Sequence, residues 1–349
     1  MINNFFFSTE ILRWFRENGR DLPWRETKDP YAIWLSEIIL QQTRIVQGWE
    51  YWERFMQTYP KVEDLAAASE DDVLKLWQGL GYYSRARNLH AAAKQIVALG
   101  SFPNTLDGIK SLKGVGDYTA AAIGSFAFDI PAAVVDGNVY RVLSRYFGID
   151  TPINSTQGKK EFAALAQSLL PASDAASYNQ GMMDFGAIQC TPQSPKCLLC
   201  PLAETCEALR CGRVEELPIK NKTVKVKTRH LSYIYIRCKS SAADGAGNSE
   251  PMVAIHRRGE GDIWQGLWEP YNVSDIKELP SFVKNPILLA KDVKHVLTHR
   301  ILLADFYLLE TESRPPLPDD YIWIRESEIE DYGVPRLIEI MLEKINPVE

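Results

Sequence analysis

Residues 190–206 have the sequence CTPQSPKCLLCPLAETC, which spaces four thiols as C-x6-C-x2-C-x5-C. Four closely spaced thiolates suit either a tetrahedral zinc ion or a [4Fe-4S] cluster. Zinc ribbons usually repeat a C-x2-C pair, whereas this run has one such pair between two longer arms, so the spacing favours the cluster. A disulfide framework or four buried apolar side chains would also fit four cysteines at these positions. The predicted cluster ligands are Cys190, Cys197, Cys200 and Cys206.

The composition is that of a soluble globular chain. The 349 residues suggest about two domains at roughly 150 residues each, and 46% hydrophobic and 24% charged residues are ordinary values. The first residues lack a basic flank and a small-residue cleavage site, so we expect no export signal and disfavour disulfides. No apolar run approaches the roughly 18 residues that span a bilayer. We therefore expect no membrane partner and a cytoplasmic location.

A net charge of −6 argues against a broad electrostatic coating of nucleic acid. Non-specific binding of DNA depends on Lys and Arg side chains that neutralise phosphates. Any contact with nucleic acid must therefore be local.

The apolar pattern changes character along the chain. Up to about residue 210, apolar residues recur at intervals of three and four, which indicates helices. Start and stop signals predict helices over 31–42, 82–99 and 117–128. Further on, the pattern predicts strands over 231–237, 252–256 and 301–309 and a final helix over 336–345. We predict domains over 1–212 and 229–349, joined by a basic linker over 213–228.

Glu37 is a candidate general acid. On the predicted helix over 31–42 it shares a face with Ile33 and Gln41, so its carboxyl lies on a largely apolar surface. Burial raises the pKa of a carboxyl, which can then hold a proton near neutral pH and give it to a leaving group, as in glycoside-cleaving enzymes. The alternative is a surface Glu at the edge of the apolar stripe.

Asp136 directly precedes a predicted helix and is a candidate electrostatic stabiliser. A carboxylate at a helix N-terminus is held ionised, so it can stabilise or attack a cationic sugar carbon. Asn138 is placed to hydrogen-bond the same site. The alternative is a plain N-cap, because Asp is a preferred residue there.

Gly114 and Gly116 lie in residues 112–119, LKGVGDYT, and predict a tight turn between two helices. Such a turn leaves backbone N–H groups at a helix start, where they can hold a phosphate without any lysine. An acidic protein can contact DNA locally in this way. The alternative is an ordinary corner between helices.

The hairpin at 112–119, the downstream Asp136 and the cysteine run at 190–206 resemble, in this order, the helix-hairpin-helix DNA glycosylases of the endonuclease III superfamily. Within it, residues 36–43, SEIILQQT, and 79–89, GLGYYSRARNL, are similar to the MutY-type adenine DNA glycosylases. The resemblance covers residues 5–212. It implies a two-lobed, mainly α-helical catalytic domain with a [4Fe-4S] loop.

The resemblance also implies an activity. The expected substrate is duplex DNA that contains adenine mispaired with 8-oxoguanine or guanine. The expected enzyme is a monomer, associated with the nucleoid if the protein is bacterial. Glu37 would protonate the flipped adenine at N7, and Asp136 would stabilise the oxocarbenium ion. Four residues match positions that enter the duplex or contact the opposing base, with Tyr82 as the wedge: Gln42, Thr43, Leu80 and Tyr82.

Tyr118 stands where strand-cutting relatives carry a lysine. A Schiff base needs an amine nucleophile, which tyrosine does not have. We therefore predict hydrolysis to an abasic site without strand cleavage. Tyr118 and Asn138 are expected to support the step that Asp136 stabilises.

The C-terminal part resembles the Nudix-like α+β recognition domain of the same family, through residues 257–259 and 264–270. It lacks the glutamate-rich box that holds metal in nucleotide-hydrolysing relatives, so we expect binding without hydrolysis. The family's Phe-Ser-His loop is Leu297-Thr298-His299 here. Thr298 and His299 are expected to contact DNA; a plain structural histidine is the alternative.

Two further functions stay open on the sequence. One is a related mismatch or oxidised-pyrimidine glycosylase with the same hairpin and cluster. The other is a non-catalytic DNA-lesion sensor or redox protein that uses the cluster alone.

Overall fold

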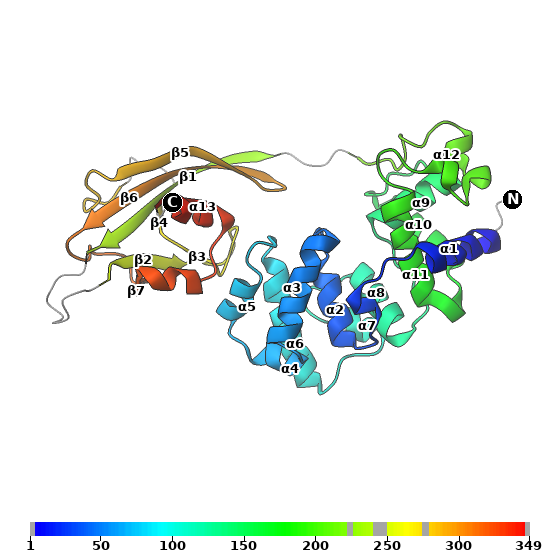
Figure 1. Cartoon of the computed structure of the whole chain (residues 1–349), viewed down its shortest axis with the longest axis horizontal. Coiled ribbons are helices and arrows are strands. Elements are labelled where there is room, and N and C mark those ends of the chain that lie inside the picture. Colours follow the sequence, from blue (N-terminus) through cyan, green and yellow to red (C-terminus); the bar gives the residue numbers. More distant parts are fainter. Residues whose placement is uncertain (1–3, 222–225, 240–249, 274–278, 346–349) are drawn as a thin grey trace. The chain divides into compact units, whose positions relative to one another are not determined.

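The computed structural model describes residues 4–221, 226–239, 250–273 and 279–345. The chain divides into two compact units (Figure 1). The first comprises Met1–Ala66 and Ala91–Lys222, and the second comprises Ala67–His90 and Thr223–Glu349. The predicted domain boundaries at 212 and 229 stay predictions. Across the described ranges no helix is long and apolar enough to cross a membrane.

The first unit is helical, as predicted. Its α-helices are α1 (Asn4–Asn18), α2 (Pro30–Ile39), α3 (Ile45–Thr58), α4 (Val62–Ala67), α7 (Leu106–Lys110), α8 (Asp117–Phe128), α9 (Gly137–Phe147), α10 (Thr156–Leu169), α11 (Ala175–Asp184) and α12 (Glu207–Arg210). Single turns are η1 (Pro23–Arg25), η2 (Ala172–Asp174), η3 (Phe185–Gln189), η4 (Cys197–Leu199) and η5 (Ala203–Thr205). Helix α5 (Glu70–Leu76) belongs to the second unit, and α6 (Ser84–Leu99) contains the division between the units.

Local signals set most helix ends. The Asp29 side chain accepts a hydrogen bond from the Tyr31 N–H and caps α2, and Gly100, at φ 80°, follows the end of α6 as predicted. The predicted helix over 31–42 was too long, because α2 ends at Ile39 and Gln42 takes a left-handed φ of 58°. A left-handed residue cannot continue a right-handed helix.

Two apolar clusters of the first unit position the helices that carry the candidate residues. Ile33 of α2 packs with Ala121, Ala122 and Phe126 of α8. Helix α9 packs its buried face against α1, α10 and α11. The first cluster places α8 beside Glu37, and the second fixes the N-terminus of α9.

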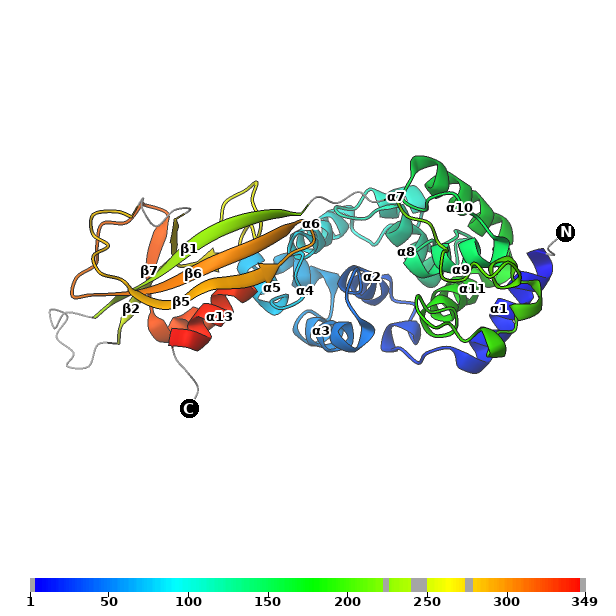
Figure 2. The same ribbon diagram turned by 90° about the horizontal axis from the view of Figure 1, so that it is seen from above.

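The second unit contains a mixed sheet with α13 (Arg336–Ile345) against it (Figure 2). The strands in the described ranges are β1 (Lys227–Cys238), β2 (Met252–Arg257), β3 (Trp268–Glu269), β4 (Tyr271–Val273), β5 (Ile287–Val296), β6 (Arg300–Thr311) and β7 (Tyr321–Arg325), followed by the turn η8 (Glu326–Asp331). The order is β3-β2-β1-β6-β5, with β4 paired to β1 and β7 paired to β2. The predicted α+β class is confirmed.

Strand β1 is the centre of this sheet and is covered on both faces. Leu231 and Tyr233 pack into one cluster with α13, and Ile234 and Ile236 pack into a cluster on the opposite face. β1 pairs in parallel with β6, and the Lys227 N–H donates to the His299 carbonyl over 3.2 Å. The strand begins at Lys227, inside the predicted linker over 213–228.

Candidate active site

A pocket of about 620 Å³ in the first unit brings all four predicted catalytic residues together. Pockets of this size hold small ligands and single nucleotides. Its lining includes Glu37, Gln42, Thr43, Tyr118, Asp136 and Asn138. Residues that lie far apart in the sequence therefore face one cavity.

Glu37 is a buried acid, with 6% of its surface exposed. Its Oε2 accepts a hydrogen bond of 3.0 Å from the Tyr118 hydroxyl. Burial raises the pKa of Glu37 to about 7; the Tyr118 hydrogen bond and the Arg25 charge oppose this rise, and the Asp136 charge adds to it. The alternative of a surface Glu was wrong, because α2 is buried along its whole second half.

Asp136 caps α9, as the sequence predicts. Its Oδ1 accepts from the Val139 N–H and its Oδ2 from the Asn138 side-chain amide, each over 2.7 Å. Burial nevertheless raises the pKa of Asp136, although these hydrogen bonds and the charge of Arg141 oppose the rise. The N-cap position alone predicts a lowered pKa, so burial outweighs it.

Arg141 connects this carboxylate to the cysteine loop. Its Nη2 donates to the Asn138 Oδ1 over 2.9 Å, and its Nε donates to the Cys190 carbonyl over 2.8 Å. Arg141 is 8% exposed. One guanidinium therefore orients the Asn138 amide and the start of the loop together.

Sequence analysis missed a second, smaller cavity of about 50 Å³ that also reaches Glu37. Its lining includes Arg20, Trp24, Arg25, Gln180 and Met183. The available signal was the RDLPWR run at 20–25, which places two cations and a Trp close together. Nothing local in that run indicates that it packs beside α11.

The predicted hairpin is present between α7 and α8. Gly114 has φ 78°, a conformation that favours glycine, and Gly116 is the N-cap of α8 without a side-chain hydrogen bond. The Lys113 N–H donates to Gln95 Oε1 over 2.7 Å. The turn is thus tied to α6, and the first N–H groups of α8 have no side-chain cap.

The cysteine loop fits an iron–sulfur cluster. All four predicted ligands line one small hollow, and none forms a disulfide, so the disulfide alternative was wrong. Arg145 Nη1 lies 3.4 Å from Cys190 Sγ, and donors to sulfur are typical of cluster sites.

A pocket of about 540 Å³ in the second unit collects four more predicted residues. Leu80, Tyr82, Thr298 and His299 all line it. The hydroxyls of Tyr82 and Thr298 are hydrogen-bonded to each other. Tyr82 has a left-handed φ of 47° and is 46% exposed.

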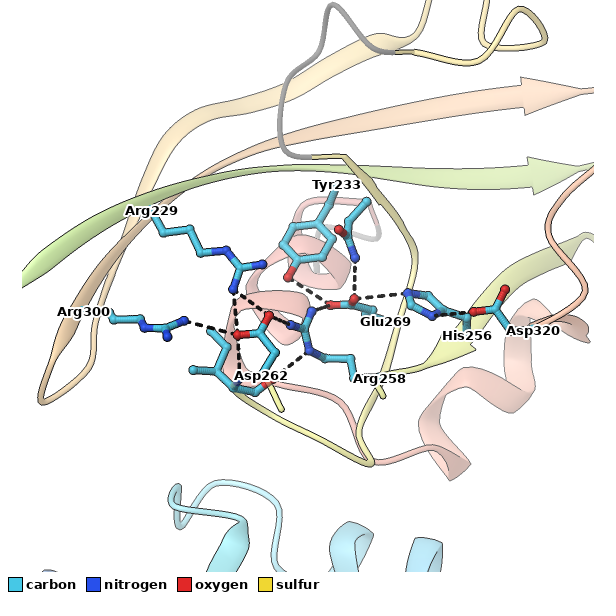
Figure 3. A network of polar contacts seen from close by, with 10 residues as sticks. Arg229, Tyr233, His256, Arg258, Asp262, Glu269, Arg300 and Asp320 are labelled. Carbon is cyan, nitrogen blue, oxygen red and sulfur yellow. Dashed lines mark hydrogen bonds and ion pairs between the residues drawn. The ribbon is translucent and has the colours of Figure 1, made fainter. Parts of the chain in front are cut away.

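A buried ion network supports one wall of this second pocket (Figure 3). Glu269, 1% exposed, accepts hydrogen bonds from four side chains in or next to the sheet: Tyr233, His256, Arg258 and Asn272. Asp262 in turn accepts from Arg258 and from two further arginines, Arg229 and Arg300. Asp262 and Arg300 line the pocket, so Glu269 fixes the pocket wall through Arg258.

Replacing Glu269 by Gln is expected to destabilise the sheet by about 3 kcal/mol, because the buried Arg258 loses its buried counter-ion and keeps only the partly exposed Asp262. Hydrogen exchange of β1 and β6, followed by mass spectrometry, measures the loss. The matched control is Glu310→Gln, which breaks the half-exposed pair with Arg237 at 3.6 Å and should cost less than about 1 kcal/mol. Equal protection in the two variants would contradict the prediction.

Comparison with known proteins agrees with both units. The HhH-GPD superfamily of base excision DNA repair proteins matches residues 35–171, and the iron–sulfur binding domain of endonuclease III matches 190–206. The NUDIX domain matches 247–344. A thermostable thymine-DNA glycosylase is 34% identical with a TM-score of 0.56, and covers 60% of this chain and 97% of its own. A trapped endonuclease III–DNA covalent intermediate shares the fold, with 22% identity and a TM-score of 0.53 over 61% of this chain and 99% of its own.

The helical fold, the hairpin and the cysteine loop together define a helix-hairpin-helix DNA glycosylase. An adenine DNA glycosylase of Buchnera aphidicola subsp. Schizaphis graminum is 30% identical over 97% of this chain and 98% of that protein. Another, from Buchnera aphidicola subsp. Acyrthosiphon pisum, is 39% identical over 76% and 74%, and the Mus musculus protein is 42% identical over 61% and 44%. The chain belongs to the adenine DNA glycosylase family.

Proposed function

We propose that this enzyme removes adenine mispaired with 8-oxoguanine or guanine in duplex DNA, by hydrolysis of the N-glycosidic bond. The observation that carries the proposal is the shared pocket of Glu37 and Asp136. Such a pocket needs an extrahelical base, because the glycosidic bond is not accessible inside the stacked duplex.

The two carboxyl groups take different roles. Glu37, with a pKa of about 7, donates its proton to N7 of the departing adenine. Asp136 then stabilises the positive charge that develops on the deoxyribose. Asn138 orients Asp136 through its amide, and Tyr118 orients Glu37 through its hydroxyl. Water completes the reaction and leaves an abasic site.

The enzyme is proposed to be monofunctional, because Tyr118 provides no amine for a Schiff base. Incubation with substrate duplex and borohydride should trap no covalent complex with the wild-type protein. Tyr118→Lys, which places an amine beside Asp136, is the positive control. A trapped adduct in the wild type at the level of that control would contradict the assignment.

The remaining predicted residues contact DNA. Gln42 and Thr43 line the Glu37 pocket, and the start of α8 at Gly114 and Gly116 offers backbone donors to a phosphate. Thr298 and His299 share a pocket with Leu80 and Tyr82 and are proposed to recognise the opposing 8-oxoguanine. The Nudix-like unit binds without hydrolysing nucleotides, and the enzyme acts as a monomer.

Release of free adenine from four duplexes tests the proposal. The duplexes carry adenine opposite 8-oxoguanine, adenine opposite guanine, thymine opposite guanine, or thymine glycol. Free adenine should leave the first two only. Release of thymine or of the oxidised pyrimidine instead would assign a related glycosylase, and binding without any base release would assign a non-catalytic sensor.

The rate of adenine release should depend on pH through Glu37. A general acid works only when protonated, so the single-turnover rate should be high below pH about 7 and should fall as pH rises through that value. Above it the fall is about tenfold per pH unit. Rates measured from pH 5.5 to 9 at constant ionic strength check the profile; a flat profile across this range would contradict the acid role.

The cysteine loop is proposed to hold a [4Fe-4S] cluster on Cys190, Cys197, Cys200 and Cys206. Cys197→Ser should lower the iron content and the affinity for substrate duplex, because the loop loses its cross-link. The rate of adenine release by enzyme that is bound to the duplex should change less. Iron analysis and filter binding measure both effects, with the exposed Cys211→Ser as the control. A colourless wild-type protein that a chelator inactivates would indicate zinc instead.

A further inference from the structure

Asp184 is a fully buried carboxylate with no part in the steps above. It ends α11 and is 0% exposed. Its Oδ2 accepts from the Arg20 backbone N–H and from Arg25 Nη1, and its Oδ1 accepts from Arg20 Nε and Arg25 Nη2, each over 2.9 Å. Arg20 Nη2 also donates to Oδ1. Charge-assisted hydrogen bonds in this number fix both guanidinium groups in one orientation.

These two arginines lie in the wall of the candidate active site. Arg20 lines both the larger and the smaller cavity, and Arg25 lines the smaller one. Glu37 lines both cavities as well. Arg25 Nη1 also donates to the Arg20 carbonyl over 2.9 Å, which ties the segment between α1 and α2 into a single support. The segment has its anchor at Asp184.

The charged groups around Glu37 show why a carboxylate is useful at position 184, beside Arg20 and Arg25. The titratable or charged groups that line the two cavities with Glu37 come from four neighbouring segments: Arg20 and Arg25 before α2, Arg44 after it, Tyr118 of α8, and Asp136 and Tyr140 at the start of α9. The charge of Arg25 favours ionised Glu37, against burial. A carboxylate paired with Arg25 cancels most of that charge at a distance.

We propose that Asp184 is a positioning residue of the base pocket: it locks Arg20 and Arg25 in the cavity wall and balances their charge, so that Glu37 keeps its proton until the base leaves. The inference rests on the proposed function of Glu37. Asp184 touches no substrate itself and acts through the two arginines.

The first test is the pH profile of Asp184→Asn in the full chain. This variant keeps the size of the side chain and removes its charge. In a plot of the single-turnover rate against pH, the falling limb, where the rate decreases with rising pH, should move to lower pH by about one unit. Relative to the wild type, the rate should then be about tenfold lower at pH 8 and only about twofold lower at pH 6. A purely structural loss would lower the rate by one factor at every pH and would overturn the proposal.

The matched control is Asp150→Asn. Asp150 also pairs with an arginine of the first unit, Arg213, and lines neither cavity. Its profile should coincide with that of the wild type. A limb that moved equally in both variants would show a general charge effect and would also overturn the role of Asp184.

Arg25→Gln keeps the test decisive if Asp184→Asn does not fold, as judged by circular dichroism. Removing the cation leaves Asp184 less compensated, so the falling limb should move to higher pH, opposite to the first variant. An unmoved limb, or one at lower pH, would overturn the inference. The wild-type measurement separates the two proposals. If the wild type released no adenine, or its rate did not fall with rising pH, the proposed function would be contradicted. If the wild-type rate fell with rising pH but neither variant shifted that fall, only the role of Asp184 would be contradicted.

Discussion

Glu37→Gln is expected to bind substrate duplex with nearly wild-type affinity and to release adenine at least about a thousandfold more slowly. Glutamine fills the same buried space and can still accept the hydrogen bond from Tyr118. It has no acidic proton to give to N7, and unprotonated adenine is a poorer leaving group than protonated adenine. Single-turnover assays with excess enzyme, with abasic sites revealed by alkali, measure the rate.

The control for this variant is Glu50→Gln on α3. Glu50 is exposed and lines neither cavity of the first unit. It makes the same chemical change at a site without a proposed role, and its rate should stay within about twofold of the wild type. A Glu37→Gln enzyme that kept a rate within about tenfold of the wild type would remove Glu37 from the acid role.

Asp136→Asn is expected to slow adenine release by about a hundredfold or more, because the developing positive charge loses its anionic neighbour. The fold should hardly change. Asparagine is as good an N-cap as aspartate, so its oxygen can still accept from the Val139 N–H. Rate and thermal unfolding measured on one preparation separate catalysis from stability.

Two comparison variants sharpen this second test. Asp29→Asn makes the same change at the N-cap of α2, which lines neither cavity, and should leave the rate unchanged. Asp136→Ala should lose the same rate and, in addition, about 1 kcal/mol of stability with the cap. If Asp136→Asn stayed within about tenfold of the wild type, roughly 1.4 kcal/mol of barrier, the electrostatic contribution would be minor.

Structural features that depend on a few adjacent residues could be predicted from the sequence. Asp136 as an N-cap, the glycine after α6 and the turn at Gly114 each depend on a few adjacent residues, and the structure has all three. The helical period of its neighbours placed Glu37 on a largely apolar surface but left a surface position open, and the burial of Glu37 became clear only from the structure. Family resemblance, rather than pattern, connected Glu37 to Asp136, which lie far apart in the sequence.

Features that depend on distant packing could not be predicted. The pairing of Arg20 and Arg25 with Asp184 joins the segment before α2 to the end of α11, and neither segment alone signals the other. Strand β5 was missed because exposed and partly buried residues mix irregularly along it, without a clean alternation. The early end of α2 depends on the backbone of Gln42, a residue type that gives no stop signal.

The hydrogen bond from the Lys227 N–H to the His299 carbonyl has a practical consequence for dissecting the enzyme. This hydrogen bond joins the first residue of β1 to the residue just before β6. A fragment cut for crystallography, or grafted onto another glycosylase, must therefore begin upstream of Lys227. A later start would leave the His299 carbonyl without its donor and would weaken the support of the turn between β5 and β6, which contains Thr298.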